Sequence, residues 1–297
     1  MSDFVQQQNS ICDFATSDSW VILSPIEQSI KKKIEAVGTP LKDWDINIYR
    51  GVLTGCNEAF IIDTAKRDEI LANCQSDEER EKTAELIRPI LRGRDIKRYG
   101  YIDNGLYLIN THNGIKGKLP RIEINDYPAV KAHLDQYWDR ISTRADKGDT
   151  PYNLRNCAYL EDFSQPKIIW KRIGSILRFS YDDRGCLGLD STCFAVGEYI
   201  EYLCCILNSL MGHYLLKDSP KTGTGDLLVS VQAIEPVRVP HVSPNDNRLS
   251  MLLVKQIVDG TEATEKEIND IVFSLYGLSP SEREYVTLYV KQSQQSL

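Results

Sequence analysis

The sequence predicts an α+β fold that combines a mixed sheet, interspersed helices and a C-terminal helical segment. From about residue 46 to residue 240, short segments rich in β-branched and aromatic residues alternate with Gly, Asn and Asp turns. Stretches with helical spacing of apolar residues interrupt these segments without a regular βαβ rhythm. The chain has 297 residues, 42% hydrophobic and 26% charged, so it can bury one large core or two modest ones.

Residues 1–45 are predicted to form a lead-in and a connector helix. Residues 1–19 are polar and lack the basic start and apolar segment of a secretory signal, so we expect a cytoplasmic protein. Ser24 and Pro25 suit the start of a helix, and Gly38 suits its end. The apolar residues between them share one helical face: Ile26, Ile30, Ile34 and Val37.

Residues 46–245 hold the strand-like segments, such as GLYLIN, PKIIWKRI and LRFSYDD, and are predicted to form the main domain. Helices are predicted there in three places: near 78–91, 126–141 and 198–216. Residues 246–297 are predicted to form a helical spacer, because apolar residues recur at helical spacing. Seven acidic and two basic residues lie within 259–284, a poor surface for phosphate, so we expect this segment to pack on protein. No apolar run approaches the roughly 20 residues that span a bilayer, so no membrane association is expected.

The cysteines and histidines do not have the spacing of a metal site. The chain has eight cysteines without a C-x2-C pair and four histidines without an H-x3-H pair. A structural zinc ion needs four converging ligands, which come in most cases from close-spaced pairs. We therefore expect ordinary thiols and no metal site in this chain.

Most catalytic motifs are absent from the sequence. No two prolines are adjacent, which excludes the N-P-P-Y loop of DNA amino-methyltransferases, and there is no P-loop and no G-x-S-x-G motif. The glycines at 223 and 225 are expected to lie in a flexible turn. One acid-x-Lys triplet, Asp95-Ile96-Lys97, resembles part of a magnesium-dependent nuclease site, with Asp63 as the nearest partner acid. A salt-bridged or phosphate-contacting segment is the alternative for that triplet.

Two basic clusters stand out in a chain whose net charge is −7. Residues 88–98 hold one acid and five basic residues: Arg88, Arg92, Arg94, Lys97 and Arg98. Residues 167–178 hold no acid and four basic residues: Lys167, Lys171, Arg172 and Arg178. Such cations suit phosphate oxygens and the edge of guanine, although solvated strand and helix faces would have the same composition. The loop at 146–156 either presents Tyr152, Asn153 and Arg155 to a nucleic-acid groove or is an ordinary surface turn.

An ordered set of motifs resembles a known family over nearly all of residues 20–285. The motifs are GVLTGCNEAFIID (51–63), ELIRPILRGRDIKRY (85–99), YNLR (152–155), PKIIW (166–170), DSTCFA (190–195), TGTGDLLVSVQAIEPVRVP (222–240) and EKEINDIVFSLYGLSPSE (265–282). Together they resemble the TaqI-like C-terminal specificity domain, or target-recognition domain, of type IIG restriction-modification enzymes. They are more distantly similar to the specificity subunits of type I systems.

The resemblance implies a chain that binds double-stranded DNA and has no catalytic residues of its own. In that family an endonuclease and an adenine methyltransferase precede this domain, so S-adenosylmethionine and magnesium are expected in those modules and no cofactor in this chain. The chain is expected to be a fragment or a separately encoded subunit whose partner is the methyltransferase/endonuclease module. A magnesium-dependent nuclease and a protein-interaction subunit are the alternative functions.

The resemblance also implies roles for particular residues. Thr54, Gly55 and Asn57 would form a tight turn beside the DNA or the methyltransferase cleft. Arg92, Arg94, Lys97 and Arg98 would serve the phosphates or the fold. Tyr152, Asn153 and Arg155 would lie in a base-contacting loop, and Lys171 and Arg172 complete the expected DNA-binding set. The helical tail resembles the spacer that packs back on the enzyme.

Overall fold

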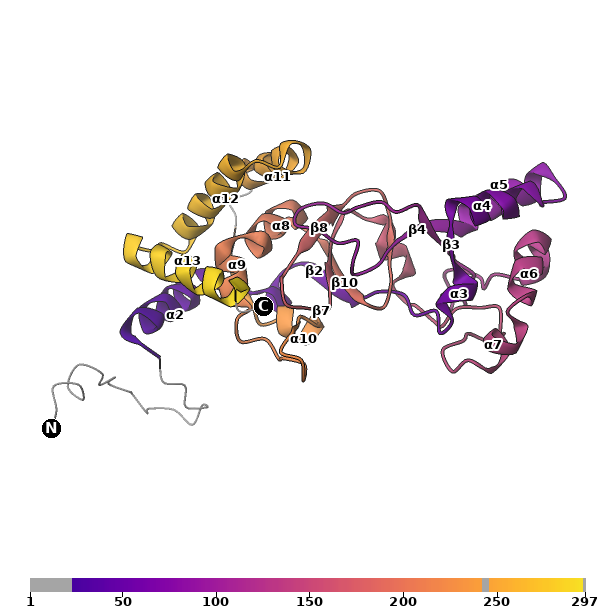
Figure 1. The fold of residues 1–297 in the computed structure, drawn as a ribbon, viewed down its shortest axis with the longest axis horizontal. Coiled ribbons are helices and arrows are strands. Elements are labelled where there is room, and N and C mark those ends of the chain that lie inside the picture. The colour runs from indigo at the N-terminus through magenta and orange to yellow at the C-terminus, as the bar shows by residue number, and fades with distance from the viewer. Residues whose placement is uncertain (1–22, 242–245, 296–297) are drawn as a thin grey trace.

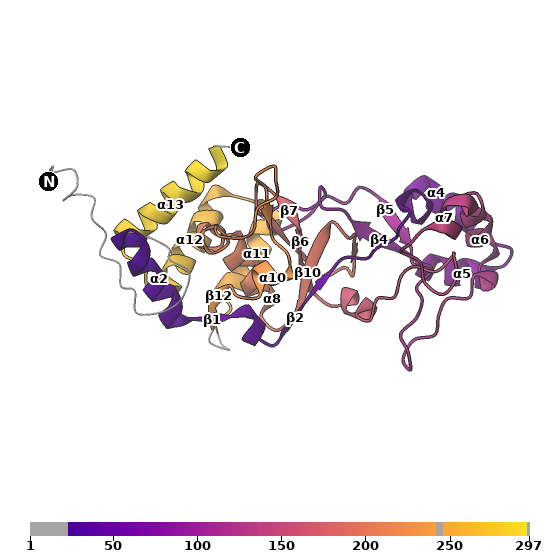
Figure 2. The same cartoon turned by 90° about the horizontal axis from the view of Figure 1, so that it is seen from below.

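The computed structural model describes residues 23–241 and 246–295 of the chain. The predicted polar lead-in at 1–19 lies outside these residues. Helices occupy both ends of an elongated molecule, and most of the strands lie between them (Figures 1 and 2). Within the described residues, no helix is long and apolar enough to cross a membrane.

One end of the molecule is built from the first helix and the last three. Helix α2 (Pro25–Val37) begins with a capping box formed by Ser24 and Glu27, as the sequence predicts for its start. Its face buries Ile30, whereas Val37 is exposed. The C-terminal helices lie at the same end in Figure 1: α11 (Arg248–Asp259), α12 (Glu262–Leu275) and α13 (Pro280–Gln295).

Two four-stranded sheets form the middle of the molecule. The first has the order β2 (Ile46–Arg50), β10 (Thr192–Gly197), β6 (Lys167–Lys171) and β8 (Phe179–Asp182), and all neighbouring strands are antiparallel. The second has the order β3 (Ile61–Asp63), β5 (Leu106–Ile109), β4 (Ile87–Leu91) and β9 (Leu187–Gly188), with β4 and β9 parallel. Two short pairs complete the strands: β1 (Gly38–Pro40) with β12 (Arg238–Pro240), and β7 (Ile173–Gly174) with β11 (Leu227–Leu228).

The first sheet is buried on both faces and separates two hydrophobic cores. Ile168 and Trp170 of β6 belong to one core, and Ile169 between them belongs to the other. This alternation explains why the three central residues of β6, Ile168 to Trp170, are all apolar instead of alternating with polar residues. The first core also contains Leu41 and Leu249, so residues on both sides of the predicted boundaries at 45 and 245 share it. Those boundaries stay predictions.

The remaining helices lie in two groups, one at the end opposite α2 and one nearer the first sheet. Helices α3 (Asn57–Phe60), α4 (Thr64–Ala72), α5 (Asp77–Leu86), α6 (Pro128–Asp135) and α7 (Trp138–Thr143) lie at the end opposite α2 (Figure 1). Helices α8 (Ile200–Asn208), α9 (Leu210–Leu215) and α10 (Val231–Ile234) lie nearer the first sheet.

All three predicted helices are shorter than their apolar pattern indicates, and the one predicted near 126–141 is divided into α6 and α7. The helix predicted near 78–91 ends at Leu86, and the prediction is wrong for 87–91, which form β4 and pair with β5. Pro89 has no N–H to donate within a helix. Ile87 and Ile90 are both buried where β4 pairs with β5 and β9, which favours a strand. The helix predicted near 198–216 breaks at Ser209, whose extended backbone and capping side chain begin α9.

Candidate nucleic-acid interface

The turn at Thr54 to Asn57 leads from β2 into α3. Gly55 has φ +66°, and a Cβ there would lie 3.1 Å from the Asp146 Cβ, so the turn requires glycine. Thr54 is buried and donates from its hydroxyl to the Asn57 Oδ1 at 2.5 Å, whereas Asn57 itself is exposed. The structure therefore brings the three predicted residues into one tight turn and leaves Gly55 and Asn57 accessible.

The buried guanidinium of Arg144 joins this turn to the loop at 146–156, which the sequence analysis did not anticipate. It donates to the carbonyl oxygens of Thr54, Pro151 and Asn153, and lies over the Phe60 ring at 4.3 Å. Burial lowers the pKa of Arg144 to about 10. Arg144 therefore holds the turn at 54–57 against the loop at 146–156, and its guanidinium is not available to a ligand.

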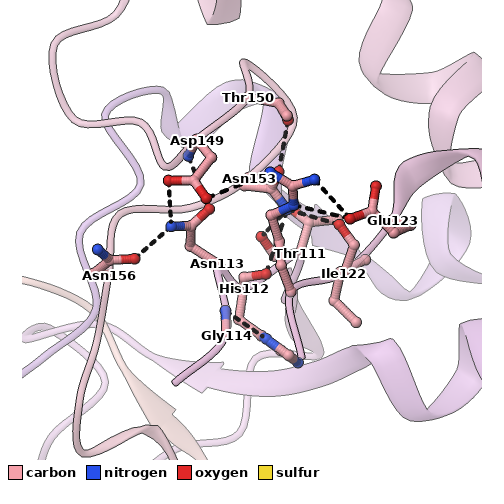
Figure 3. A network of polar contacts seen from close by, with 11 residues as sticks. Thr111, His112, Asn113, Gly114, Ile122, Glu123, Asp149, Thr150, Asn153 and Asn156 are labelled. Atoms are coloured by element: carbon pink, nitrogen blue, oxygen red, sulfur yellow. Dashed lines mark hydrogen bonds and ion pairs between the residues drawn. The ribbon is translucent and has the colours of Figure 1, made fainter. Parts of the chain in front are cut away.

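Within the loop at 146–156, the three predicted residues have different environments. Asn153 is 1% exposed, and its amide donates to the carbonyl oxygens of Thr111, His112 and Ile122 (Figure 3). Tyr152 is partly buried and donates from its hydroxyl to Asp135 at 2.6 Å. Arg155 is exposed and paired with Asp146 at 3.0 Å. The expectation that the loop presents Asn153 to a groove is wrong for this structure, because every polar atom of that side chain has a partner within the protein.

The segment at 92–97 contains an ion pair that holds the loop together. Arg92 donates to both carboxylate oxygens of Asp95, at 3.0 and 2.9 Å, and Asn104 donates to one of them at 2.9 Å. Burial acts to raise the pKa of Asp95, but the hydrogen bonds from Arg92 lower it below its usual value. Asp63, the partner acid considered for a nuclease, caps α4 by accepting from the backbone of Lys66. The geometry is that of a structural ion pair and does not provide a pair of open magnesium ligands.

Arg98 is directed toward the C-terminal helices. Its guanidinium pairs with Glu265 of α12, donates to the carbonyl of Asn208 at 2.6 Å and lies 5.4 Å from the Tyr99 ring centroid. These contacts connect the 92–100 segment to α8 and α12. Arg98 and Arg92 therefore serve the fold, one of the two roles that the sequence analysis left open for them. Lys97 donates from its ammonium only to the Arg94 carbonyl, at 3.3 Å, among the described residues.

Four other cations lie on segments that meet at the turn at 190–191, and Arg155 shares a hollow with one of them, Arg50. We call these five residues the basic seam: Arg50, Arg94, Arg155, Lys171 and Arg172. Arg50 ends β2 and pairs with Asp190 at 3.5 Å. The Ser191 carbonyl accepts from the Arg172 backbone, and its hydroxyl accepts from Gly93, which precedes Arg94. A Cβ on Gly93 would lie 2.9 Å from the Lys171 Cγ, so the Gly93 backbone packs against the Lys171 side chain.

The basic seam continues into a hollow between the end of β2 and residues 155–159. Arg50 and Arg155 line this hollow of about 240 Å³ together with Tyr159. Within the described parts of the chain, Arg94, Lys171 and Arg172 have no ion-pair partner. Four of the five seam residues were predicted from the sequence. Arg50 was missed, although it directly precedes the first motif of the family resemblance, at 51–63.

The fold is of the α+β class, and the part of the chain that the structure describes contains no cluster of three or more His, Cys, Asp or Glu that could hold a metal. Residues 88–229 match the family model of the TaqI-like C-terminal specificity domain. This segment of the chain is therefore a TaqI-like specificity domain, as its sequence resemblance indicated.

One solved structure shares the fold at low sequence identity, and a second is similar at a lower TM-score. The type IIL restriction-modification enzyme MmeI, solved in complex with DNA, has a TM-score of 0.58 and 9% identity, and the match covers 88% of this chain and 37% of that chain. The type IIG restriction endonuclease BpuSI has a TM-score of 0.45 and 12% identity, covering 85% of this chain and 33% of that one. The chain thus spans little more than a third of the length of MmeI. No curated protein matches it.

Proposed function

We propose that the chain is the double-stranded DNA recognition module of a restriction-modification enzyme of the type IIG kind, and that it directs methylation and cleavage carried out elsewhere. The observation that carries this proposal is the specificity-domain match over residues 88–229, the segment that contributes four of the five seam cations. The structural relative MmeI is itself described in complex with DNA.

The arrangement of charge supports a bound polyanion at the basic seam. Unpaired Arg and Lys side chains release counterions when they neutralise phosphates, which supplies much of the affinity of a DNA-binding protein. The chain is acidic overall and the seam residues Arg50 and Arg155 are paired with acids, but Arg94, Lys171 and Arg172 have no ion-pair partner among the described residues. DNA responds to the local patch and not to the net charge. Gly55 and Asn57 remain candidate contacts because their turn is exposed and rigid.

The partner protein in this proposal is a methyltransferase/endonuclease module, in the same polypeptide or in a separate subunit. S-adenosylmethionine and magnesium would be bound by that module. The C-terminal helices are the proposed contact, since α11 exposes Met251, Val254 and Val258 at helical spacing.

The proposal is tested by selection from a randomised duplex pool at two salt concentrations, followed by sequencing of the retained DNA. We expect a motif of a few base pairs and an affinity that falls steeply as salt rises. Absence of enrichment at both salt concentrations would refute DNA recognition by this chain. Salt-dependent binding without an enriched motif would reduce the proposal to nonspecific binding.

A further inference from the structure

A small β-hairpin between β5 and α6 packs Ile115 and Leu119 against the core that contains Ile169 and leaves its tip exposed. Ile115 and Leu119 pair across it, with the Ile115 N–H donating to the Leu119 carbonyl at 2.8 Å and the Leu119 N–H donating back at 2.9 Å. Lys116, Gly117 and Lys118 form its tip, and all three are exposed. Gly117 has φ +76°, and a Cβ there would meet no atom within 4 Å, so no other part of the protein packs on the tip at this position.

The base of the hairpin is held by hydrogen bonds, whereas its tip is exposed. The buried amide of Asn153 bridges both legs by donating to the His112 carbonyl at 3.3 Å and the Ile122 carbonyl at 2.9 Å (Figure 3). Thr150 fixes the orientation of that amide by donating to its oxygen at 2.6 Å. Asn153 was expected to contact DNA, and in this structure it positions the element beside it.

A second polar clamp holds one leg of the hairpin against the loop at 146–156. Asn113 donates to Asp149 at 3.0 Å and to the Asn156 Oδ1 at 2.5 Å, and accepts from the Asp149 backbone at 2.8 Å (Figure 3). The hydrogen bonds of the Asn113 and Asn153 amides fix the backbone of this short hairpin more firmly than an ordinary solvent-exposed connection requires. Preorganised elements lose less conformational entropy when they bind.

The hairpin stands beside the basic seam. Its flank lines a hollow of about 780 Å³ that reaches Asn156. Asn156 also lines the hollow that contains Arg50 and Arg155. The two hollows are therefore adjacent, and a duplex bound along the seam would pass the hairpin.

The tip has the shape and chemistry of a groove-contacting element. The major groove of B-DNA admits a two-stranded ribbon, and a lysine ammonium is a good donor to the O6 and N7 acceptors of guanine. Lys116 has no ion-pair partner among the described residues, whereas Lys118 is paired with Glu161. Gly117 keeps the tip narrow and permits close backbone approach.

We infer that the hairpin at residues 114–120 enters the major groove and determines base preference at one or two adjacent positions, with Lys116 as its main base contact and Asn153 as a positioning residue. This inference rests on the proposed DNA recognition by the chain. A phosphate contact by the same lysine would give affinity without preference, and the experiment separates the two.

The test compares motifs selected from a randomised duplex pool by the full chain and by its Lys116→Ala and Lys118→Ala variants. Lys116→Ala is expected to abolish preference at one or two adjacent positions and keep it elsewhere, and to weaken binding of the selected duplex by roughly 5- to 100-fold. Lys118→Ala is expected to have a smaller effect at the same positions. The matched control is Lys255→Ala on the exposed face of α11, which should retain the full motif.

Asn113→Ala tests the positioning of the hairpin without altering its tip or the buried Asn153. We expect weakened preference at the Lys116-dependent positions, preference retained elsewhere, and a thermal unfolding temperature close to that of the unmodified chain. A purely structural role would instead weaken binding of all sequences in proportion.

The outcomes distinguish this inference from the proposed function. If the unmodified chain selects a motif and Lys116→Ala selects the same one at every position, the hairpin inference is overturned and DNA recognition stands. If Lys116→Ala weakens all sequences alike and lowers the salt slope by about 1, the lysine contacts phosphate and the inference is likewise overturned. If the unmodified chain selects no motif, both fail.

Discussion

A single carboxylate joins the first and last helices of the structure, and its removal has a predictable cost. Glu282 is 4% exposed and accepts hydrogen bonds from the Ser29 hydroxyl at 2.7 Å, the Lys33 ammonium at 2.5 Å and the Ser279 N–H at 2.6 Å. Burial acts to raise the pKa of this carboxyl, but those hydrogen bonds outweigh it and lower the pKa from 4.5 to about 2. The ionised form is therefore the one that stabilises the fold.

The size of the effect follows from the pKa. Each unit of pKa is worth about 1.4 kcal/mol, so the charged form of Glu282 contributes about 3 kcal/mol at neutral pH. Because its pKa in the folded protein is lower than in the unfolded chain, this contribution is present above pH 4.5 and is lost as the pH falls toward 2. At pH 3 about 1 kcal/mol should remain.

The variant that tests this reasoning is Glu282→Gln, which keeps the shape of the side chain and removes its charge. Urea unfolding followed by circular dichroism should show a loss of about 2–3 kcal/mol at pH 7 that shrinks to about 1 kcal/mol at pH 3. Glu284→Gln, an exposed change on the same helix, is the control and should stay within about 0.5 kcal/mol of the unmodified chain. A Glu282→Gln variant as stable as the unmodified chain at pH 7, or a difference independent of pH, would refute the reasoning.

Three further predictions test the core and the seam. Lys167→Met should cost about 3–5 kcal/mol in urea unfolding, because it leaves the fully buried Asp182 carboxylate without its cation; a loss below 1 kcal/mol would contradict this. Lys171→Ala should weaken binding of all duplex sequences alike and lower the slope of log affinity against log salt by about 1, measured by titration at several salt concentrations; a change at one base position only would exclude a phosphate contact. Arg98→Ala should lower the thermal unfolding temperature and leave DNA affinity unchanged, because its guanidinium is bonded to Glu265; a reduced salt slope would instead place Arg98 on the DNA.

The predicted DNA-binding residues separate into two groups once their partners are known. Arg92 and Arg94 stand two residues apart in one basic cluster, yet Arg92 is bonded to the buried Asp95 and Arg94 has no ion-pair partner within the described residues. Asn153 has an amide side chain of the kind that can contact bases, but this side chain is buried and its hydrogen bonds are made within the protein. Composition alone does not separate these cases, because a charged or amide side chain is equally polar with and without an internal partner.

Local patterns were sufficient wherever neighbours in the chain decide the structure. The capping box at Ser24 and Glu27 lies within one helical turn, so its residues determine where α2 begins. The β-branched and aromatic residues of PKIIWKRI predicted the strand that β6 forms. The α+β class and the family resemblance of residues 88–229 were likewise available from the sequence.

Contacts between distant segments decided the rest. Residues 87–91 are a strand because β5 and β9 pair with them, which overrides their helical pattern. Arg98 is a structural cation because Glu265, far along the chain, lies beside it. The hairpin tip at Lys116 projects because Asn153 closes its base. Desolvation and hydrogen-bond geometry depend on which atoms the fold brings within about 3 Å of one another. The sequence by itself therefore determined the kind of domain, and only the tertiary structure decided which of its cations are free to meet a ligand.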